Sequence, residues 1–186
     1  MAGVTLAWTT VPAPAPIRAL TVAVSDAGVC AVGFGADRAR PAAVVDRLGE
    51  APVDDPQRTD PVARQLAEYL AGTRTVFTLP LDWRLTSGTQ RTVLQTLYDG
   101  VGYGETITYG ELAARSSAFS AGHTAARGVG SIMASNPIPV IVPCHRVLAA
   151  GPGGWALGGF GGGRATKEWL LALEGVLTPA LDFGTC

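Results

Sequence analysis

The stretch TYGELAARSSAFSAGHTAARGVGSIMASNP, residues 108–137, decides the expected fold. Its beginning predicts a short helix, because Thr108 can cap the helix and Glu111, three residues later, completes a capping box. Its second half predicts another short helix that ends before Asn136. Two short helices on one connection are typical of a helix-turn-helix.

The second of these helices has a face that is poor in side-chain volume. Two glycines inside a helix cost about 1 kcal/mol each relative to alanine, so a compensating role is expected. The face can allow close approach of the backbone to a partner, or close packing on a neighbouring helix, and the sequence leaves both interpretations open. The small residues are Ala125, Ala126, Gly128, Gly130 and Ser131.

The next stretch is IPVIVPCHRVLAAG at 138–151. It begins with a β-branched run, and a cysteine and a histidine then stand side by side. Cys144 can be a packing residue, a metal ligand or a nucleophile. A metal is not expected, because zinc needs four ligands and the chain has no close Cys and His cluster. The positive charge and imidazole of Arg146 and His145 favour a nucleophile, since such neighbours lower the pKa of a thiol. Pro143 cannot donate to a sheet ladder, so we expect the chain to leave regular structure there.

A base for this cysteine has to meet a geometric condition. Adjacent side chains on an extended chain point to opposite faces, so Cys144 and His145 need a local bend or a bridging water. A carboxylate is then needed to orient the imidazole. Glu168 and Glu174, on an amphipathic helix expected at 164–175, are the nearest downstream candidates.

Further out, the first half of the chain predicts a small mixed lobe. Three β-branched runs predict strands at 4–11, 18–25 and 28–35, and a fourth strand is expected at 75–83. Helices are expected at 40–50, 60–73 and 88–101. For the helix at 60–73 we expect Asp60 as N-cap, Pro61 at the first position and Gly72 past the end.

These elements predict an α+β protein with two domains. Residues 1–86 form an N-terminal α/β lobe, and residues 87–186 form a mostly helical lobe with the helix-turn-helix and an active-site cysteine on a strand or turn. The 186 residues suffice for one core or two small lobes.

Composition narrows the environment of the protein. Hydrophobic residues make up 47% and charged residues 16%, and the apolar runs are too short to span a membrane. The N-terminus lacks the pattern of a secretory signal, so we expect a cytoplasmic protein without membrane contact. Three widely spaced cysteines, Cys30, Cys144 and Cys186, argue against a disulfide framework.

Charge is distributed unevenly although the net charge is only −1. No acidic residue occurs in 112–166, a window with both histidines and four arginines. Such a segment indicates an electropositive face for an anionic partner, or chance in a chain that uses few charges. The arginines are Arg115, Arg127, Arg146 and Arg164.

The ordered motifs NPIPVIVPCHRV and GGFGGGRATKEWLLALEG, preceded by GETITYGELAA and AARGVGSIMASNP, resemble the O6-alkylguanine-DNA alkyltransferases, also called methylated-DNA–protein-cysteine methyltransferases. The resemblance covers about residues 87–175. It implies direct-reversal DNA repair, in which the alkyl group of O6-alkylguanine, and of O4-alkylthymine, moves irreversibly to one cysteine.

The resemblance also implies roles for single residues. Cys144 would be the nucleophile, His145 its base through a water, and Glu174 the residue that orients His145. Tyr109 would bond guanine N3 and donate a proton to the leaving base. The carbonyls of Cys144 and Val147 would read the exocyclic amine of guanine.

The implied partner is double-stranded DNA, bound in the minor groove by a monomer without cofactor. Arg127 would enter the base stack in place of the flipped nucleotide, and Asn136 would brace the turn before the active site. The other expected DNA-binding residues are Gly128, Ser131 and Arg115, and the expected pocket residues are Pro143, Val147, Trp155, Phe160 and Gly161.

The sequence also departs from the family pattern. Phe160 stands where tyrosine is common and Gly161 where serine is common, and the loops at 115–124 and 149–159 are longer. The first half has only Cys30 and no histidine, so the structural zinc of some relatives is not expected. Two other classes remain as alternatives: a Cys-His hydrolase and a module that recognises DNA damage without repairing it.

Overall fold

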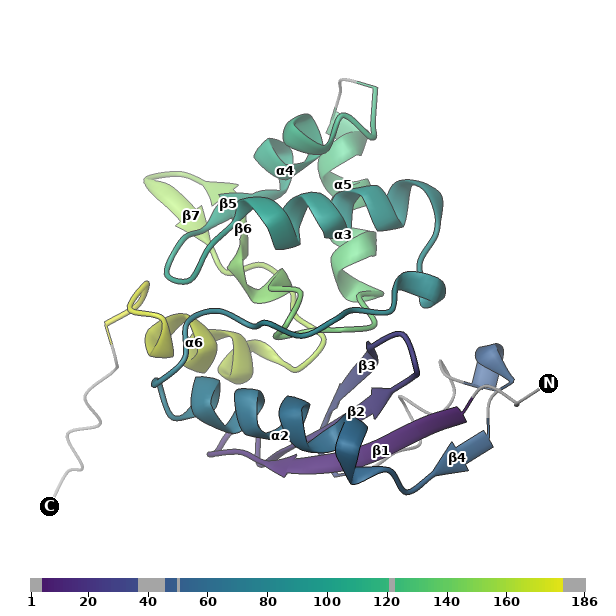
Figure 1. The fold of residues 1–186 in the computed structure, drawn as a ribbon. Coiled ribbons are helices and arrows are strands. Elements are labelled where there is room, and N and C mark those ends of the chain that lie inside the picture. The colour runs from purple at the N-terminus through teal and green to yellow at the C-terminus, as the bar shows by residue number, and fades with distance from the viewer. Residues whose placement is uncertain (1–4, 37–45, 50, 121–122, 179–186) are drawn as a thin grey trace, which may run out of the picture.

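The structure, a computed structural model, describes residues 5–36, 46–49, 51–120 and 123–178. Strands of the first part of the chain form a four-stranded sheet. Figure 1 shows a helix that covers this sheet, with further helices stacked beyond it. The predicted α+β class is confirmed by this arrangement.

The N-terminal part is built on a sheet with strand order β3-β2-β1-β4. β1, β2 and β3 form two antiparallel hairpins, while β4 pairs parallel to β1. The three predicted strands are therefore confirmed, and α2 lies across the sheet. The elements are β1 (Thr5–Pro12), β2 (Ala19–Val24), β3 (Val29–Phe34), β4 (Ala51–Val53) and α2 (Pro56–Leu70).

The start of α2 differs from the prediction. Its N-cap is Asp55 rather than Asp60, and the Arg58 backbone N–H donates to Asp55 Oδ1 at 3.3 Å. The same Asp-Pro signal occurs five residues earlier in the chain, and the earlier copy begins the helix, leaving Pro61 inside it. The predicted end is confirmed, since Gly72 follows the helix with a φ of 73°.

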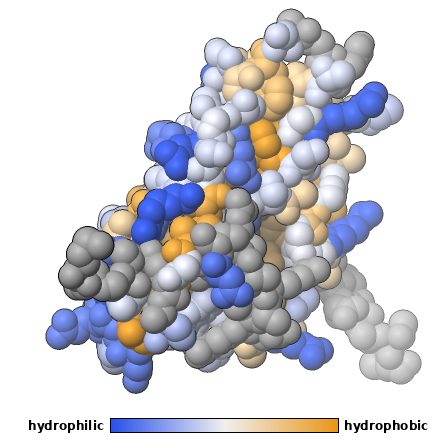
Figure 2. Space-filling model, turned by 90° about the vertical axis from the view of Figure 1, so that its right-hand side faces the viewer, coloured by the Kyte–Doolittle hydropathy of each residue, from blue (hydrophilic) through white to orange (hydrophobic). Residues whose placement is uncertain are grey.

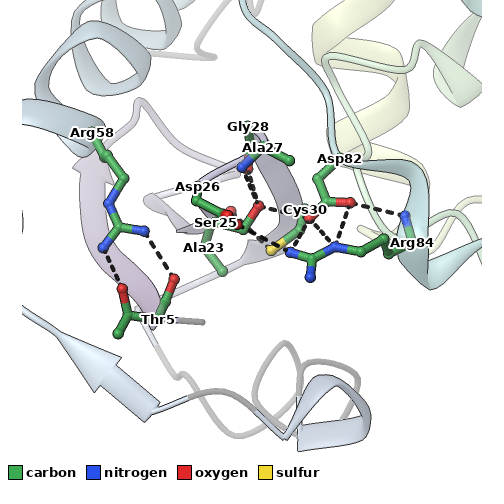
Figure 3. Close-up of polar contacts among 10 residues, drawn as sticks. All are labelled: Thr5, Ala23, Ser25, Asp26, Ala27, Gly28, Cys30, Arg58, Asp82 and Arg84. Carbon is green, nitrogen blue, oxygen red and sulfur yellow. Dashed lines mark hydrogen bonds and ion pairs between the residues drawn. The ribbon is translucent and has the colours of Figure 1, made fainter. Parts of the chain in front are cut away.

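The prediction of a strand at 75–83 is wrong. Only one residue pair of a ladder forms, between Val29 and Leu81, and a single 3₁₀ turn, η2 (Trp83–Leu85), follows. A buried polar cluster fixes the segment instead: the Ser25 hydroxyl donates to Asp82 Oδ2 at 2.6 Å, and Arg84 binds the same carboxylate (Figure 3). The close approach explains Gly28, because a Cβ there would lie 2.2 Å from the Pro80 carbonyl oxygen.

The helix predicted at 40–50 lies mostly outside the described residues. The described part of that range contains one 3₁₀ turn, η1 (Asp46–Leu48).

The C-terminal part is mostly helical, as predicted. The capping box of Thr108 and Glu111 is present, and the α4–α5 pair forms the expected helix-turn-helix. A small sheet with strand order β5-β6-β7 is an addition that the sequence analysis missed. The elements are α3 (Gly88–Gly100), β5 (Ile107–Thr108), α4 (Tyr109–Ser116), α5 (His123–Ala134), η3 (Cys144–Arg146), β6 (Val147–Gly151), β7 (Gly154–Ala156) and α6 (Arg164–Leu173).

One hydrophobic core joins the two parts of the chain. Leu66 and Tyr69 of α2 belong to the same buried cluster as Leu94 of α3 and Ile138 before the cysteine.

In Figure 1, α6 lies between α2 and the other C-terminal helices. Glu174, directly after α6, bonds Tyr69 of α2, and Lys167 of α6 bonds the Val147 carbonyl of β6. One face of α6 is buried, and this burial fixes the position of the helix relative to the cysteine. The buried residues of this face are Thr166, Lys167, Leu170 and Leu171.

The outer surface carries few large apolar side chains. Among the described residues, only Val76 and Trp155 are large hydrophobic residues that are exposed. Figure 2 shows one face, on which hydrophobic residues lie in small groups between hydrophilic ones. In the described part of the chain, no helix has the length and apolar character needed to cross a bilayer.

Candidate active site

Cys144 begins η3, a 3₁₀ turn that starts directly after Pro143. The turn supplies the local bend that the sequence required, so the cysteine lies on a 3₁₀ helix and not on a strand. The β-branched run before it forms turns, with Val140 buried at a φ of 74°. Such a backbone is strained for a β-branched residue by about 1–3 kcal/mol, and the surrounding packing has to hold it.

The thiol of Cys144 is buried and protonated. Burial raises the pKa of Cys144 to about 11, although a hydrogen bond from Asn136 and the charge of Lys167 oppose the change. The expectation that Arg146 would lower this pKa is wrong, because its guanidinium is paired with Glu174. A protonated thiol reacts slowly, so the site needs a base.

His145 is placed to serve as that base. Its Nε2 lies 2.9 Å from Glu174 Oε1, and its Nδ1 is buried without a partner among the described residues. Burial lowers the pKa of His145, against the opposing effect of Glu174, so the ring is neutral at neutral pH. With its proton on Nε2 facing the carboxylate, the ring presents a free lone pair at Nδ1.

Glu174, at the end of α6, is the carboxylate that orients the imidazole. Glu168 is excluded from that role, because it pairs with Arg164 on the surface. Arg146 binds Glu174 twice, through Nε to Oε2 and through a terminal nitrogen to Oε1, both at 2.9 Å. Burial would raise the pKa of Glu174, but the hydrogen bonds and charges of His145 and Arg146 hold it well below its usual range.

Lys167 is a site residue that the sequence analysis missed. Its ammonium group is buried and donates to the carbonyls of Val147 at 2.7 Å and Gly159 at 3.4 Å. Burial lowers the pKa of Lys167 to about 8, and its charge favours the thiolate of Cys144. A signal was present in the sequence, because Lys167 is the only lysine in a chain with thirteen arginines.

Two cavities meet at Cys144. One, of about 320 Å³, lies between α4, α5 and the glycine-rich turn; it is lined by Tyr109, Gly130, Met133, Ala134, Cys144, Gly159, Phe160 and Gly161. The other, of about 340 Å³, extends to the edge of β3, where Phe34 packs against Phe160 with ring centroids 5.4 Å apart. The structure therefore brings three of the predicted residues, Tyr109, Phe160 and Gly161, to the cysteine.

The other three predicted pocket residues line neither of these cavities. Trp155, on β7, is 43% exposed and lines a groove with Pro16 and Trp169. Pro143 lines a different cavity, together with Phe77 and Tyr103. The carbonyl of Val147 accepts the hydrogen bond from Lys167, so its lone pairs are not all open to a ligand.

The small face of α5 serves two purposes. A Cβ on Gly128 would lie 2.6 Å from the Phe119 ring, which makes Gly128 a close-packing residue rather than an open one. A Cβ on Gly130 would meet nothing within 4 Å, and Gly130 lines the cavity at Cys144. Arg127 and Ser131, on the same helix, are exposed.

The electropositive face is smaller than the acid-free window predicts. Arg146 and His145 are buried and bind Glu174, and Arg115 donates to the Gly100 carbonyl at 2.8 Å. Asn136 braces the segment before the active site. Its amide donates to the Val142 carbonyl and accepts from the Ile138 N–H, both at 3.0 Å.

The fold and the site together define a class: helix-turn-helix proteins with a buried Cys-His-Glu cluster beside the second helix. Two family models match the chain. Residues 10–83 match the ribonuclease-like domain of 6-O-methylguanine DNA methyltransferase, and residues 88–176 match its DNA binding domain. The chain belongs to the 6-O-methylguanine DNA methyltransferase family.

Individual relatives agree with this assignment. The methylated-DNA–protein-cysteine methyltransferase of Mycolicibacterium paratuberculosis is 42% identical over 68% of this chain and 72% of its own length. The mouse protein of the same name is 47% identical over 47% of this chain, a match that spans 39% of the mouse protein. The crystal structure of Mycobacterium tuberculosis OGT in complex with DNA superposes with a TM-score of 0.70 at 33% identity, covering 91% of this chain and 93% of that one.

Proposed function

We propose that this protein repairs alkylated DNA by taking the alkyl group of O6-alkylguanine, and of O4-alkylthymine, onto Cys144. The observation that carries the proposal is the buried Nδ1 of His145, which has no partner among the described residues and belongs to a ring oriented by Glu174. A single water between this atom and the thiol would complete a path for the proton.

The reaction balances with groups of this chain and water. The proton of the Cys144 thiol passes through the water to His145 Nδ1, and Glu174 stabilises the resulting imidazolium. The thiolate attacks the alkyl carbon, so an S–C bond forms as the C–O6 bond breaks. Burial raises the pKa of Tyr109, which keeps the phenol protonated and able to donate to N3 of the leaving guanine. The proton held by His145 then returns through water to the Tyr109 phenolate, so both side chains regain their starting protonation states.

The product explains why each protein would act once. The thioether on Cys144 needs a second nucleophile for its removal, and Cys30 lies in a separate core cluster where its thiol donates to the Ala23 carbonyl at 3.4 Å. Irreversible, stoichiometric transfer follows from this arrangement.

The DNA would bind at the helix-turn-helix. A base inside a duplex has to be flipped out to reach a buried thiol, and minor-groove proteins commonly insert a side chain as they distort the stack. Arg127 is exposed on α5. Asn136 lies two residues after the end of this helix. We assign DNA binding and alkyl transfer to residues 87–186, and a supporting role to the α/β lobe at 1–86. We propose that the protein is cytoplasmic and binds the minor groove of DNA as a monomer.

A single-turnover experiment tests the proposal. The protein is incubated with duplex DNA that contains O6-methylguanine, and the modified residue is located by peptide mass. We expect one methyl group per protein, on Cys144, and none on a Cys144→Ala variant that still binds the DNA. A Cys30→Ala variant serves as the matched control and is expected to accept the group normally.

The same experiment separates the other candidate classes. A hydrolase would release product repeatedly without retaining the alkyl group. A recognition module would bind the lesion and leave both DNA and protein unmodified. Either result would overturn the proposal.

A further inference from the structure

Tyr69 links the N-terminal part of the chain to the catalytic cluster. It lies near the end of α2, is fully buried, and donates its phenol proton to Glu174 Oε1 at 2.6 Å. The same oxygen accepts the Nε2–H of His145 at 2.9 Å. The phenol oxygen and Nε2 lie 3.4 Å apart, and with a terminal nitrogen of Arg146 they make three donors on one carboxylate oxygen.

The other polar groups around His145 come from the C-terminal part of the chain. Arg146 holds both oxygens of Glu174, and the Gly104 N–H donates to Oε2 at 3.2 Å. The charge of Lys167 opposes protonation of the imidazole, and the Cys144 thiol precedes it in η3. Within the described chain, Tyr69 is thus the only side chain before residue 87 that bonds this carboxylate.

We infer that Tyr69 is a positioning residue for alkyl transfer: its hydrogen bond draws negative charge away from the Glu174 oxygen that faces His145, and thereby keeps the imidazole neutral and able to accept the proton of Cys144. The inference rests on the proposed function. It gives the N-terminal lobe a part in the chemistry in addition to its structural support.

The physical argument concerns the charge on one oxygen atom. A carboxylate that accepts several hydrogen bonds spreads its charge among the donors. Without the Tyr69 hydroxyl, more negative charge remains at Oε1 beside Nε2, and this favours the protonated imidazole. The pKa of His145 then rises, and a larger fraction of the protein has Nδ1 already occupied by a proton at acidic pH.

The test compares Tyr69→Phe with Tyr103→Phe. The first variant removes the hydroxyl but keeps the ring, which packs against Phe77 with centroids 5.2 Å apart. The second removes a hydroxyl that donates to the Leu173 carbonyl, one residue before Glu174, and therefore controls for a lost hydrogen bond at the end of α6.

Two readouts are needed for each protein. The first is the titration of His145 by NMR on histidine-labelled protein, which is simple because His123 is the only other histidine. The second is the pH dependence of single-turnover transfer from O6-methylguanine. For Tyr69→Phe we expect the His145 pKa to rise by about 0.5–1 unit. The rate then falls by about threefold to tenfold at pH values well below the His145 pKa of the parent protein, and changes less than about twofold at pH values about one unit or more above the raised pKa.

The outcomes separate the inference from the proposed function. If the unmodified protein places no alkyl group on Cys144, the proposed function fails, and this inference fails with it. If transfer occurs but the His145 titration and the rate profile of Tyr69→Phe match those of Tyr103→Phe, only the inference is overturned. If Tyr69→Phe does not fold, 3-fluorotyrosine is placed at position 69 in a protein whose other three tyrosines are replaced by phenylalanine. Its hydroxyl is a stronger donor than that of tyrosine, so the His145 pKa is expected to fall. An unchanged His145 pKa overturns the inference.

Discussion

The pKa of the Cys144 thiol is subject to two opposing effects. Positively charged neighbours in the sequence would lower it, and burial in the fold raises it. The sequence places Arg146 two residues away, yet the fold turns that guanidinium toward Glu174 and buries the thiol. Desolvation then dominates and raises the thiol pKa to about 11. Reactivity therefore depends on groups that arrive from other elements.

Lys167 is one of these groups, and its charge can be tested alone. Lys167→Met keeps much of the apolar stem but removes the ammonium that favours the Cys144 thiolate. We expect the thiol pKa to rise and transfer at neutral pH to slow by about tenfold, the effect of about one pKa unit. The pH dependence of alkylation by iodoacetamide measures the thiol pKa directly.

The conservative control for this prediction is Lys167→Arg, which keeps the positive charge and is expected to remain closer to the parent protein. The parent should also lose its advantage over Lys167→Met as pH rises through about 8, where Lys167 loses its proton. Equal thiol reactivity of the parent and Lys167→Met at every pH would contradict the role of the charge.

At the scale of single elements, α5 contains two glycines in different surroundings. Gly128 packs against the Phe119 ring, and Gly130 has free space beside it. Gly130→Ala has free space and is expected to stabilise the helix by up to about 1 kcal/mol. Gly128→Ala has to displace the Phe119 ring and is expected to be less stable than Gly130→Ala by about 1–3 kcal/mol. Thermal unfolding of the two single variants gives the comparison.

The double variant with Phe119→Ala isolates the cause of this difference. Removal of the ring should make the added methyl at Gly128 favourable, so the two effects are not additive. Equal melting temperatures for the two glycine variants would contradict the packing argument.

The same helix presents Arg127, whose proposed role applies only to duplex DNA. Arg127→Ala is expected to slow repair of O6-methylguanine in a duplex by at least about tenfold, because the arginine would occupy the stack that the base has left. Reaction with free O6-benzylguanine needs no base flipping and should change less than about twofold. Ser131→Ala, on the same exposed helix, is a matched control. Equal losses on both substrates for Arg127→Ala would place it in the structure or in the chemistry instead.

At the level of the whole molecule, Glu174 connects three separate elements. It binds Tyr69 of α2, both His145 and Arg146 of η3, and the backbone of the turn before β5. Loss of one partner from a buried ion pair typically costs about 3–5 kcal/mol, because the remaining charge stays buried. Glu174→Gln is therefore expected to lower the free energy of unfolding at pH 7 by about this amount.

The pH dependence of that loss has a defined sign. The pKa of Glu174 is lower in the folded than in the unfolded protein, so its stabilisation is complete above the unfolded value of about 4.5 and decreases as the pH falls below it. The difference between parent and Glu174→Gln should shrink between about pH 5 and pH 3, as measured by urea unfolding. Glu168→Gln, in an exposed pair with Arg164, is the control and should cost less than about 1 kcal/mol. A difference that grows toward acid pH would contradict the assignment.

The sequence by itself determined the elements whose signals are local. The capping box at Thr108 predicted the start of α4, the short β-branched runs predicted β1 to β3, and the order of motifs around Cys144 indicated the family. Where two local signals competed, as at Asp55 and Asp60, the sequence alone did not show which one begins the helix.

Only the tertiary structure decided what surrounds the cysteine. It brought Lys167 and Tyr69 to the site and placed Trp155 in a separate groove. For Glu174, which the family resemblance already implied, it supplied the hydrogen-bond geometry. The physical reason is that burial and hydrogen-bond partners depend on contacts between residues distant in the chain. Tyr69 and Glu174 are 105 residues apart in the sequence, yet they share one of the shortest hydrogen bonds in the core.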